Sequence, residues 1–313
     1  MTQAVPNRRA VIDVGTNSVK LLVGDIAGGA VTPVSETSRQ TRLGAGLYAT
    51  RRLQPPAIKL TAEAVAAFSA AAAEMGAAPA RVIATSAARD AINADELFAA
   101  IERASGLKVE VLTGDKEADW VFRGVTTDPK LAQPPVMILD VGGGSTEIIV
   151  GENAAPQFRG SYSLGTVRLL ESMRPGESPG LRGLIRCRMW LRDFLRAEVA
   201  PMVKPALSGR PAALLVGTGG TATLLARVAG QMTDYDRDKI ESARLTLEGI
   251  RRDLESHWQM TQAERQKIPG LPPNRSDVIL TGVAIYESIM EEFGFKDMAV
   301  STRGLRYWAL LQK

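Results

Sequence analysis

Two stretches of this 313-residue chain read almost alike. The first is V-I-D-V-G-T-N-S-V-K-L-L-V-G-D at Val11–Asp25, and the second is I-L-D-V-G-G-G-S-T-E-I-I-V-G-E at Ile138–Glu152. Each places β-branched residues on both sides of a centre of Gly, Asn and Ser, which predicts two strands joined by a tight turn. The copies are offset by 127 residues, which is too long for a solenoid repeat. The sequence therefore predicts two related domains, each opening with the same hairpin.

The two copies match residue for residue and not only in character. Identical residues stand at Asp13/Asp140, Val14/Val141, Gly15/Gly142, Ser18/Ser145, Val23/Val150 and Gly24/Gly151. A coincidence between two ordinary hairpins is the alternative, but it would reproduce the alternation and not a shared Asp-Val-Gly-x-x-Ser.

Strands alternate with helices along the rest of the chain, which indicates an α/β architecture. Strands are expected at 81–86, 108–112, 213–216 and 298–301, and helices at 59–78, 115–125, 181–199, 246–258 and 277–293. Asn93 is expected to cap a further helix from Ala94, with Glu96 closing a capping box, and Ser276 to cap the helix at 277–293. Residues 128–135 read as a linker.

Composition excludes several kinds of site. A single cysteine, Cys187, and a single histidine, His257, exclude an internal disulfide and a Cys-rich or multi-His metal cluster. No apolar run approaches the roughly 20 residues that span a bilayer, and the first nine residues are not a signal peptide. We therefore expect a cytoplasmic protein with no membrane partner. The net charge of +4 gives no reason to expect a nucleic-acid partner.

The basic residues are concentrated in one segment. Between Arg168 and Arg210 there are nine basic and four acidic residues. Within the helix expected at 181–199, arginines recur at the i,i+4 pairs Arg182/Arg186 and Arg192/Arg196, so their charges are neighbours. This helix can guide a long polyanion, or it can be an ordinary solvated face; both interpretations remain open.

The centres of both hairpins have the composition of anion-binding turns. Small residues expose consecutive backbone N–H groups to a ligand, and hydroxyl and amide side chains add donors. We expect the following residues to bind phosphate: Gly15, Thr16, Asn17 and Ser18, together with Gly142, Gly143, Gly144 and Ser145. A third such turn, Gly217, Thr218, Gly219, Gly220 and Thr221, follows a strand at a helix start. Ordinary turn chemistry is the alternative for any one of these loops.

The two hairpins differ in one informative position. If each closes through a two-residue loop, Asp13 lies opposite Lys20 in the first copy, which is a favourable pair. Asp140 then lies opposite Glu147 in the second, where like charges are unfavourable unless a cation bridges them. Carboxylates with phosphates nearby suit Mg²⁺ or another divalent cation. Asp140 and Glu147 are therefore the predicted metal ligands, with a solvated strand residue as the alternative for Glu147.

Four further segments carry a resemblance to a known family. They are T-S-A-A-R-D-A-I-N at 85–93, G-D-K-E-A at 114–118, V-G-T-G-G-T at 216–221 and N-R-S-D-V-I-L at 274–280. With the hairpins, they make the chain similar to the exopolyphosphatase/guanosine pentaphosphate phosphatase family of the actin-like superfamily, from about Ala10 to Leu305. Near the end, Gly304–Trp308 departs from the Arg-Glu-Gly usual in that family.

The resemblance implies a fold and its domain limits. The fold is α/β, with two duplicated actin-like (ribonuclease H-like) domains flanking a central cleft. Domain I is expected at residues 1–126, completed by a C-terminal helix at 302–313, and domain II at residues 127–301.

The resemblance also implies that Glu117 is the general base that activates water, and that Arg89 binds phosphate. Independently, Glu117 shares a predicted helix face with Val121 and Val125. Apolar neighbours would raise the pKa of its carboxyl group and make it a better base. Without the resemblance, the favoured interpretation of Glu117 is an acid placed at a helix N-terminus by the macrodipole. Arg89 is then equally well interpreted as an ordinary surface arginine.

The implied activity is exopolyphosphatase, which removes terminal phosphate from inorganic polyphosphate with Mg²⁺. Removal of the 5′ phosphate of guanosine pentaphosphate is the nearest alternative, because both substrates present a phosphoanhydride. An ATP-dependent small-molecule kinase and a guanosine-tetraphosphate-binding regulator of the same fold are further alternatives. Polyphosphate or a guanosine polyphosphate is thus the expected partner, and a homodimer is left open.

Overall fold

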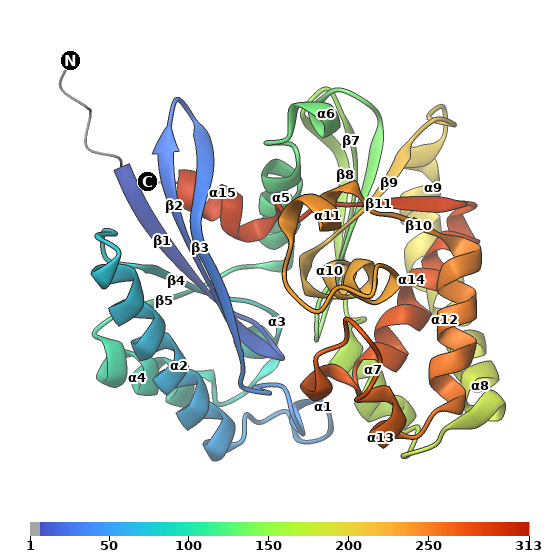
Figure 1. Ribbon diagram of the computed structural model, residues 1–313, viewed down its shortest axis with the longest axis horizontal. Coiled ribbons are helices and arrows are strands. Elements are labelled where there is room, and N and C mark those ends of the chain that lie inside the picture. Colours follow the sequence, from blue (N-terminus) through green and yellow to red (C-terminus); the bar gives the residue numbers. More distant parts are fainter. Residues whose placement is uncertain (1–6, 313) are drawn as a thin grey trace. The chain divides into compact units, whose positions relative to one another are not determined.

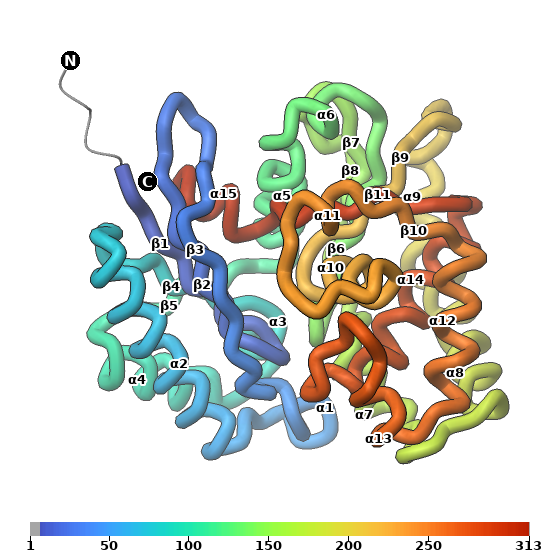
Figure 2. Tube along the Cα trace, viewed as in Figure 1, coloured from blue at the N-terminus to red at the C-terminus, as the bar shows by residue number. Residues whose placement is uncertain are grey.

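The computed structural model describes residues 7–312. The chain divides into two compact units: unit 1 takes the chain up to Thr127 and the segment from Gly304, and unit 2 is Asp128–Arg303. Figure 1 labels their helices and strands, and Figure 2 traces the same path as a tube. Unit 1 is thus assembled from two separate parts of the chain, with unit 2 inserted between them.

Unit 1 is built on a five-stranded sheet in the order β3-β2-β1-β4-β5. The strands β1, β2 and β3 are antiparallel neighbours, whereas β1, β4 and β5 run parallel. The predicted first hairpin is confirmed as β1–β2. The strand bounds are β1 Asn7–Val14, β2 Ser18–Ala27, β3 Ala30–Gln40, β4 Arg81–Ala84 and β5 Val109–Val111.

The two faces of this sheet are covered by different helices. Alternate residues of a strand point to opposite faces, and Ile12, Val14 and Leu21 join the hydrophobic core on the side of α2 and α4. Asp13 and Lys20 point to the other face, where α15 packs on β1, β2 and β3. The helices of unit 1 are α1 Leu47–Thr50, α2 Pro55–Glu74, α3 Ser86–Asp90, α4 Ala94–Ser105, α5 Gly114–Val125 and α15 Leu305–Leu311.

The last helix, α15, packs against α5 as well as the sheet. Arg9 of β1 holds its end, because Nη1 donates to the carbonyl oxygens of Leu310 (3.1 Å) and Gln312 (2.9 Å). At its start, Gly304 lies against Gly124 of α5, where an added Cβ atom would overlap the Gly304 carbonyl group. The close approach of α5 and α15 therefore requires glycine at position 124.

Unit 2 is built on a six-stranded sheet in the order β10-β11-β9-β6-β7-β8. The second predicted hairpin is confirmed as the antiparallel pair β6–β7, and β6, β9 and β11 run parallel. This repeats the arrangement of a hairpin beside two parallel strands seen in unit 1. The strand bounds are β6 Val136–Val141, β7 Thr146–Glu152, β8 Ala155–Tyr162, β9 Leu214–Thr218, β10 Arg244–Thr246 and β11 Asp297–Val300.

Helix α14 is the centre of the core of unit 2, since every residue from Ile279 to Met290 is buried. It packs against α7, α8 and α12. No helix within residues 7–312 is both long enough and apolar enough to cross a membrane. The helices of unit 2 are α6 Pro129–Ala132, α7 Thr166–Met173, α8 Gly180–Phe194, α9 Ala200–Leu207, α10 Gly219–Ala229, α11 Arg237–Ser242, α12 Leu247–Gln259, α13 Gln262–Arg265 and α14 Ile279–Phe293, with a π-helical turn at Leu195–Val199 and a 3₁₀ turn at Pro273–Arg275.

The predicted helix caps were wrong. Asn93 precedes α4 but makes no side-chain cap. Instead, its Oδ1 accepts a hydrogen bond from the Leu53 N–H (2.8 Å) and its Nδ2 donates to the Leu53 carbonyl (3.1 Å), so it fixes the loop before α2. The helix α14 begins after Val278, with Ser276 in the preceding turn. At Asn93, hydrogen bonds with Leu53, which is distant in sequence, replace the helix cap that the local sequence predicted.

Two other predicted segments differ in detail. The expected linker at 128–135 contains the short helix α6, whose start is capped by the Asp128 side chain accepting from the Lys130 N–H (3.0 Å). The helix expected at 181–199 is α-helical only to Phe194 and continues as the π-helical turn Leu195–Val199. Pro201 follows in the first turn of α9. Because proline has no backbone N–H, it cannot donate the i→i−4 hydrogen bond that would continue a regular α-helix.

The predicted register of both hairpins is confirmed. Asp13 lies opposite Lys20, and Asp140 lies opposite Glu147. Asp13 is buried, and its Oδ1 has no hydrogen-bond partner within the described chain. Burial raises the pKa of the Asp13 carboxyl group, and the positive charges of Lys20 and Arg306 oppose that rise only in part. The attraction between Asp13 and Lys20 in the first hairpin therefore only partly offsets the cost of burying the Asp13 carboxylate.

We expect Gly124→Ala to lower the free energy of unfolding by about 1–3 kcal/mol, because the new methyl group would overlap backbone atoms that cannot rotate away. Gly249→Ala is the matched control: it lies in α12, and its Cβ would meet only the Thr246 hydroxyl at 3.2 Å and the end of Arg252. Higher helix propensity should keep that variant at least as stable as the parent. Urea denaturation followed by circular dichroism measures both; equal midpoints for the two variants would contradict the packing role of Gly124.

The pKa of Asp13 gives a pH-dependent prediction. A carboxyl group whose pKa is raised by folding makes its stabilising contribution at low pH and loses it as the pH rises through the folded value. Asp13→Asn should therefore stabilise the fold at pH 7, with a gain that shrinks towards pH 4. Asp25→Asn should act oppositely, because hydrogen bonds from Arg8 (2.7 and 2.9 Å) lower the pKa of Asp25. Thermal unfolding at both pH values tests this pair, and the same sign for both variants would refute it.

Candidate active site

Three segments meet at one edge of the sheet of unit 1. Because β1, β4 and β5 are parallel, the segments that follow them leave from the same edge, which is where α/β proteins bind ligands. These segments are Gly15–Ser18 after β1, Thr85–Arg89 after β4 and Leu112–Glu117 after β5. The structure thus brings together the first predicted phosphate loop, Arg89 and Glu117.

The first loop is held by its carbonyl groups. The Thr16 oxygen accepts from the Gly44 N–H (2.7 Å), and the Asn17 oxygen accepts from the Thr41 and Arg42 N–H groups (3.2 and 3.1 Å). Since an N–H lies opposite the carbonyl of the same planar trans peptide, the N–H groups of Asn17 and Ser18 point the other way. Two consecutive donors are therefore directed away from the segment that holds the loop.

The side chain of Asn17 adds to this donor set. It is buried, and its Oδ1 accepts from Gln40 Nε2 (3.2 Å), whereas its Nδ2 has no acceptor among residues 7–312. A buried amide donor without an acceptor is unfavourable unless a ligand supplies one. This donor beside the exposed face of the loop fits an anionic ligand.

The second loop, in unit 2, is held in the same way. The Gly142 oxygen accepts from the Thr166 N–H (2.9 Å), the Gly143 oxygen accepts from the Val167 and Arg168 N–H groups (2.8 and 3.1 Å), and the Gly144 oxygen accepts from Arg168 Nε (2.7 Å). By the same peptide geometry, the N–H groups of Gly143, Gly144 and Ser145 point away from α7. Both predicted loops therefore present consecutive backbone donors, as an anion-binding nest does.

The third predicted loop is more structural than expected. The hydroxyl of Thr218 donates to the Arg303 carbonyl (2.6 Å), and that of Thr221 donates to the Val141 carbonyl (2.6 Å). Gly217 lies in β9, where a Cβ atom would be 2.7 Å from the Met298 sulfur. These three residues fix the strand and helix, which leaves the backbone of Gly219 and Gly220, at the start of α10, as the part of this loop that can meet a ligand.

Asp140 and Glu147 form a pair of carboxylates in unit 2. They are directly paired across β6 and β7, so their side chains are on the same face of the sheet. Glu147 is buried and accepts from Ser161 Oγ (2.7 Å) on β8. Asp140 lies against Gly219, whose φ of +77° and contact with the Asp140 carboxylate both exclude a side chain there. Glycine at 219 thus makes the space in which Asp140 lies.

This carboxylate pair fits a hard divalent cation. No cluster of three or more His, Cys, Asp or Glu side chains suitable for a metal occurs within residues 7–312. A cation here would have two carboxylates from the protein and would complete its shell with water or phosphate oxygens, which is how Mg²⁺ is usually bound.

Glu117 and Arg89 form an ion pair in unit 1. Glu117 is buried on α5, on the same face as Val121 and Val125, as predicted. Arg89 Nη1 donates both to Glu117 Oε2 (2.6 Å) and to the Leu112 carbonyl (2.8 Å). The guanidinium has five N–H donors, and its Nε and Nη2 have no partner in the described part of the chain. Arg89 can therefore hold Glu117 and still present donors to a phosphate oxygen.

Sequence reasoning missed three residues beside these loops. Asp13 belongs to the repeated motif, and its match with Asp140 was a signal for a functional carboxylate. Arg306 on α15 donates to the Leu21 carbonyl (3.0 Å) and to Glu36 Oε2 (3.3 Å), which places its charge near Asp13. Arg168 supports the second loop through Gly144. No local pattern marks Arg306, because its partners are nearly 300 residues away in sequence.

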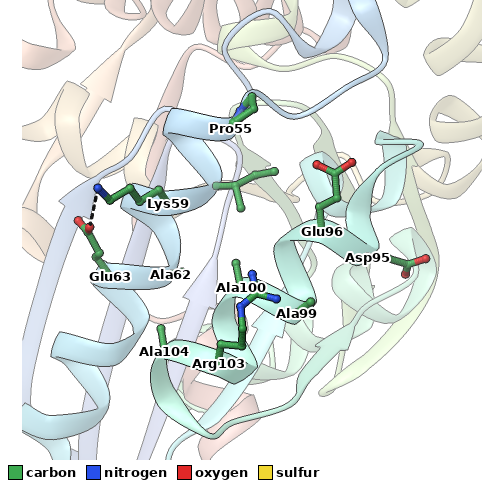
Figure 3. Close-up of a pocket in the computed structure, with 11 residues that line it drawn as sticks. Pro55, Lys59, Ala62, Glu63, Asp95, Glu96, Ala99, Ala100, Arg103 and Ala104 are labelled. Carbon is green, nitrogen blue, oxygen red and sulfur yellow. Dashed lines mark ion pairs between the residues drawn. The ribbon is translucent and has the colours of Figure 1, made fainter.

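A hollow of about 820 Å³ in unit 1 lies away from these residues, between α2 and α4 (Figure 3). Alanines form much of its lining, and Lys59, Glu63, Glu96 and Arg103 lie around it. None of the predicted site residues lines it. Its volume alone does not make it the active site.

The chain was compared with known proteins. The model of the Ppx/GppA phosphatase family matches residues 22–312. Exopolyphosphatase 2 of Mycobacterium tuberculosis is 35% identical over 299 residues, covering 91% of this chain and 90% of the relative. Exopolyphosphatase 1 of Mycobacterium bovis is 30% identical over 308 residues, covering 98% of this chain and 88% of the relative.

Solved structures agree with this assignment. The Aquifex aeolicus PPX-GPPA enzyme superposes with a TM-score of 0.77 at 30% identity, covering 98% of this chain and 99% of that one. The expected fold class, α/β with two actin-like domains, is confirmed. The chain belongs to the Ppx/GppA phosphatase family, and it is a phosphoanhydride hydrolase.

Proposed function

We propose that this chain is an exopolyphosphatase, which removes the terminal phosphate of inorganic polyphosphate with Mg²⁺. The observation that carries this proposal is the buried Glu117, held by Arg89 at the sheet edge from which the first phosphate loop leaves. The names of the two mycobacterial relatives support polyphosphate as the substrate. We also propose that it acts in the cytoplasm, the location expected from the sequence because we found neither a long apolar run nor a signal peptide.

Phosphate binding is assigned to backbone donors. In unit 1, the N–H groups of Asn17 and Ser18, with Asn17 Nδ2, would bind phosphate oxygens. In unit 2, the N–H groups of Gly143, Gly144 and Ser145 would do the same. Donors fixed in advance by the fold stabilise charge without having to reorient during the reaction.

Glu117 is assigned the proton transfer. As water attacks the terminal phosphorus, the Glu117 carboxylate takes a proton from it, and the bond from that phosphorus to the bridging oxygen breaks. The shortened polyphosphate leaves with the bonding electron pair, and orthophosphate is the other product. Arg89 fixes the orientation of the Glu117 carboxylate and directs Nε and Nη2 to a phosphate oxygen. Phosphoryl transfer depends on such positioning and charge stabilisation more than on a protein nucleophile.

Asp140 and Glu147 are assigned the divalent cation, with Ser161 orienting Glu147. When bound, the cation supplies positive charge that offsets the charge of the phosphates. This explains why the second hairpin has Glu147 where the first has Lys20.

Two alternative functions predicted from the sequence are outcomes that the experiment below can distinguish. Guanosine pentaphosphate presents the same anhydride to the same loops, and a binding role for guanosine polyphosphates would use the loops without Glu117. The kinase alternative is set aside because the family is one of phosphatases.

The test is phosphate release, with Mg²⁺ and no acceptor, from long polyphosphate, short polyphosphate and guanosine pentaphosphate at equal concentrations of terminal phosphate. We expect polyphosphate to be the better substrate by kcat/KM. Glu117→Gln should lower kcat by about 10²–10⁴-fold, the usual contribution of a general base, while polyphosphate binding is retained. Asp119→Asn, on the same helix but paired with Arg123 (2.8 Å), is the control and should keep activity.

Preference for guanosine pentaphosphate would replace polyphosphate by the nearest alternative substrate. Full activity of Glu117→Gln on all three compounds would refute the assignment of Glu117. Loss of polyphosphate binding in Glu117→Gln would mean that the residue holds substrate rather than activating water.

A second prediction concerns the metal. Glu147→Gln should raise the Mg²⁺ concentration needed for half-maximal activity, and should weaken direct Mg²⁺ binding measured by calorimetry, since one of two charged ligands is lost. Glu152→Gln, at the far end of β7 and paired with Arg210 (2.7 Å), is the control. Unchanged Mg²⁺ affinity in Glu147→Gln would overturn the assignment.

A further inference from the structure

Helix α8 of unit 2 exposes a line of large apolar side chains. Leu181, Ile185 and Met189 follow each other at i,i+4 spacing, and their exposed fractions are 53%, 56% and 51%. A different face of α8 supplies the core residues Leu184 and Leu191, so the helix is already anchored by its inner side. Single exposed apolar residues are common, but three in line on one helix indicate an interaction surface.

The same face of α8 is strongly basic. At 100° per residue, Arg182, Arg186 and Arg192 lie within about 60° of the arc from Leu181 to Met189, with Asp193 as the acidic residue among them. Arg196 follows in the π-helical turn after α8. Arg192 is 3.5 Å from Asp193, and Arg196 is 3.4 Å from Glu292. Arg182 and Arg186 lie on one side of the apolar line and form no ion pair within residues 7–312, although Arg186 Nη2 is 3.4 Å from the Met173 carbonyl oxygen.

The exposed apolar side chains and the arginines together indicate which kind of partner can bind this face of α8. A polyanion explains the arginines but leaves Leu181, Ile185 and Met189 in water. A second copy of this chain would bring two sets of arginines together, which like-charge repulsion opposes. The apolar line contributes neither to the hollow between α2 and α4 nor to the one beside Pro201 and Pro205. An anionic phospholipid surface satisfies both halves of the face, because apolar side chains enter the acyl boundary while arginines meet phosphate head groups.

We propose that α8 binds an anionic membrane surface, with Leu181, Ile185 and Met189 inserted and Arg182 and Arg186 on the lipid phosphates. The helix would lie on the membrane and not cross it, in keeping with the lack of a spanning helix among the described residues. This departs from the expectation that the protein has no membrane partner, which rested on the absence of a long apolar run. The proposal goes beyond the hydrolase activity and does not depend on it.

The experiment is co-sedimentation of the whole chain with vesicles of phosphatidylcholine alone, or of phosphatidylcholine with phosphatidylglycerol. We expect binding to the anionic vesicles only, weakened but not abolished by 0.5 M salt, because screening removes the charge attraction and leaves apolar insertion. Ile185→Ser and the pair Arg182→Gln/Arg186→Gln should each weaken binding by about tenfold or more. Circular dichroism checks that the variants are folded. We expect them to fold because the substituted side chains are exposed.

Matched control variants test whether vesicle binding depends on this face of α8 or only on the positive charge of the whole protein. Leu60→Ser removes an exposed leucine (42%) from α2 of unit 1, and Arg103→Gln/Arg252→Gln removes two charges elsewhere. Neither should change vesicle binding. Equal losses in the control and α8 variants would show non-specific attraction and overturn the proposal, as would no binding to anionic vesicles. Loss of polyphosphate affinity, without vesicle binding, in Arg182→Gln/Arg186→Gln would assign the face to the substrate instead.

Discussion

The structure of both candidate loops depends on one constraint. The carbonyl groups of each hairpin turn accept hydrogen bonds from the segment that follows the next strand along the chain, which is β3 in unit 1 and β8 in unit 2. After β3, the N–H groups of residues 41–44 hold the first turn, and after β8, those of residues 166–168 hold the second. With the carbonyl oxygens engaged, each turn directs its N–H groups outward. Were the carbonyls released, a turn could present oxygen instead, and an anion would be repelled.

Glycine makes these arrangements possible at particular positions. At Gly44, a Cβ atom would overlap the Thr16 side chain, and at Gly165 it would be 2.5 Å from the backbone of Gly143 and Gly144. Each of these residues belongs to the segment that holds a turn, so the absence of a side chain lets that segment approach. Gly219 has the equivalent role for the Asp140 carboxylate. The glycines outside the motifs matter as much as those inside them.

Much of the fold could be predicted because its signals were local. The repeated phrase established both hairpins, and the spacing of Asp13 from Lys20 and of Asp140 from Glu147 fixed the register, which the strand pairing confirms. The face of α5 that carries Glu117 followed from helical periodicity. The roles assigned to Glu117, Asp140 and Glu147 stay predictions, because they concern a ligand and not a fold.

What the sequence could not predict arises from contacts between distant segments. Asn93 had the local signal of a cap, yet its side chain bonds the backbone of Leu53. The hydroxyls of Thr218 and Thr221 looked available to phosphate, but they donate to the carbonyls of Arg303 and Val141. The position of Arg306 depends on α15 returning to β1 and β2. Periodicity and spacing do not report such partners.

The composition of unit 1 from two parts of the chain bears on how the protein is made. A ribosome releases the amino-terminal strands first, and they emerge without α15, which ends at Leu311. Until α15 has emerged, the face of β1 and β2 that this helix will cover stays open to water, and Arg306 cannot counter the charge of Asp13. Unit 2 is contiguous and can fold as soon as it has emerged. The inserted half of the molecule is thus ready before the half that begins the chain.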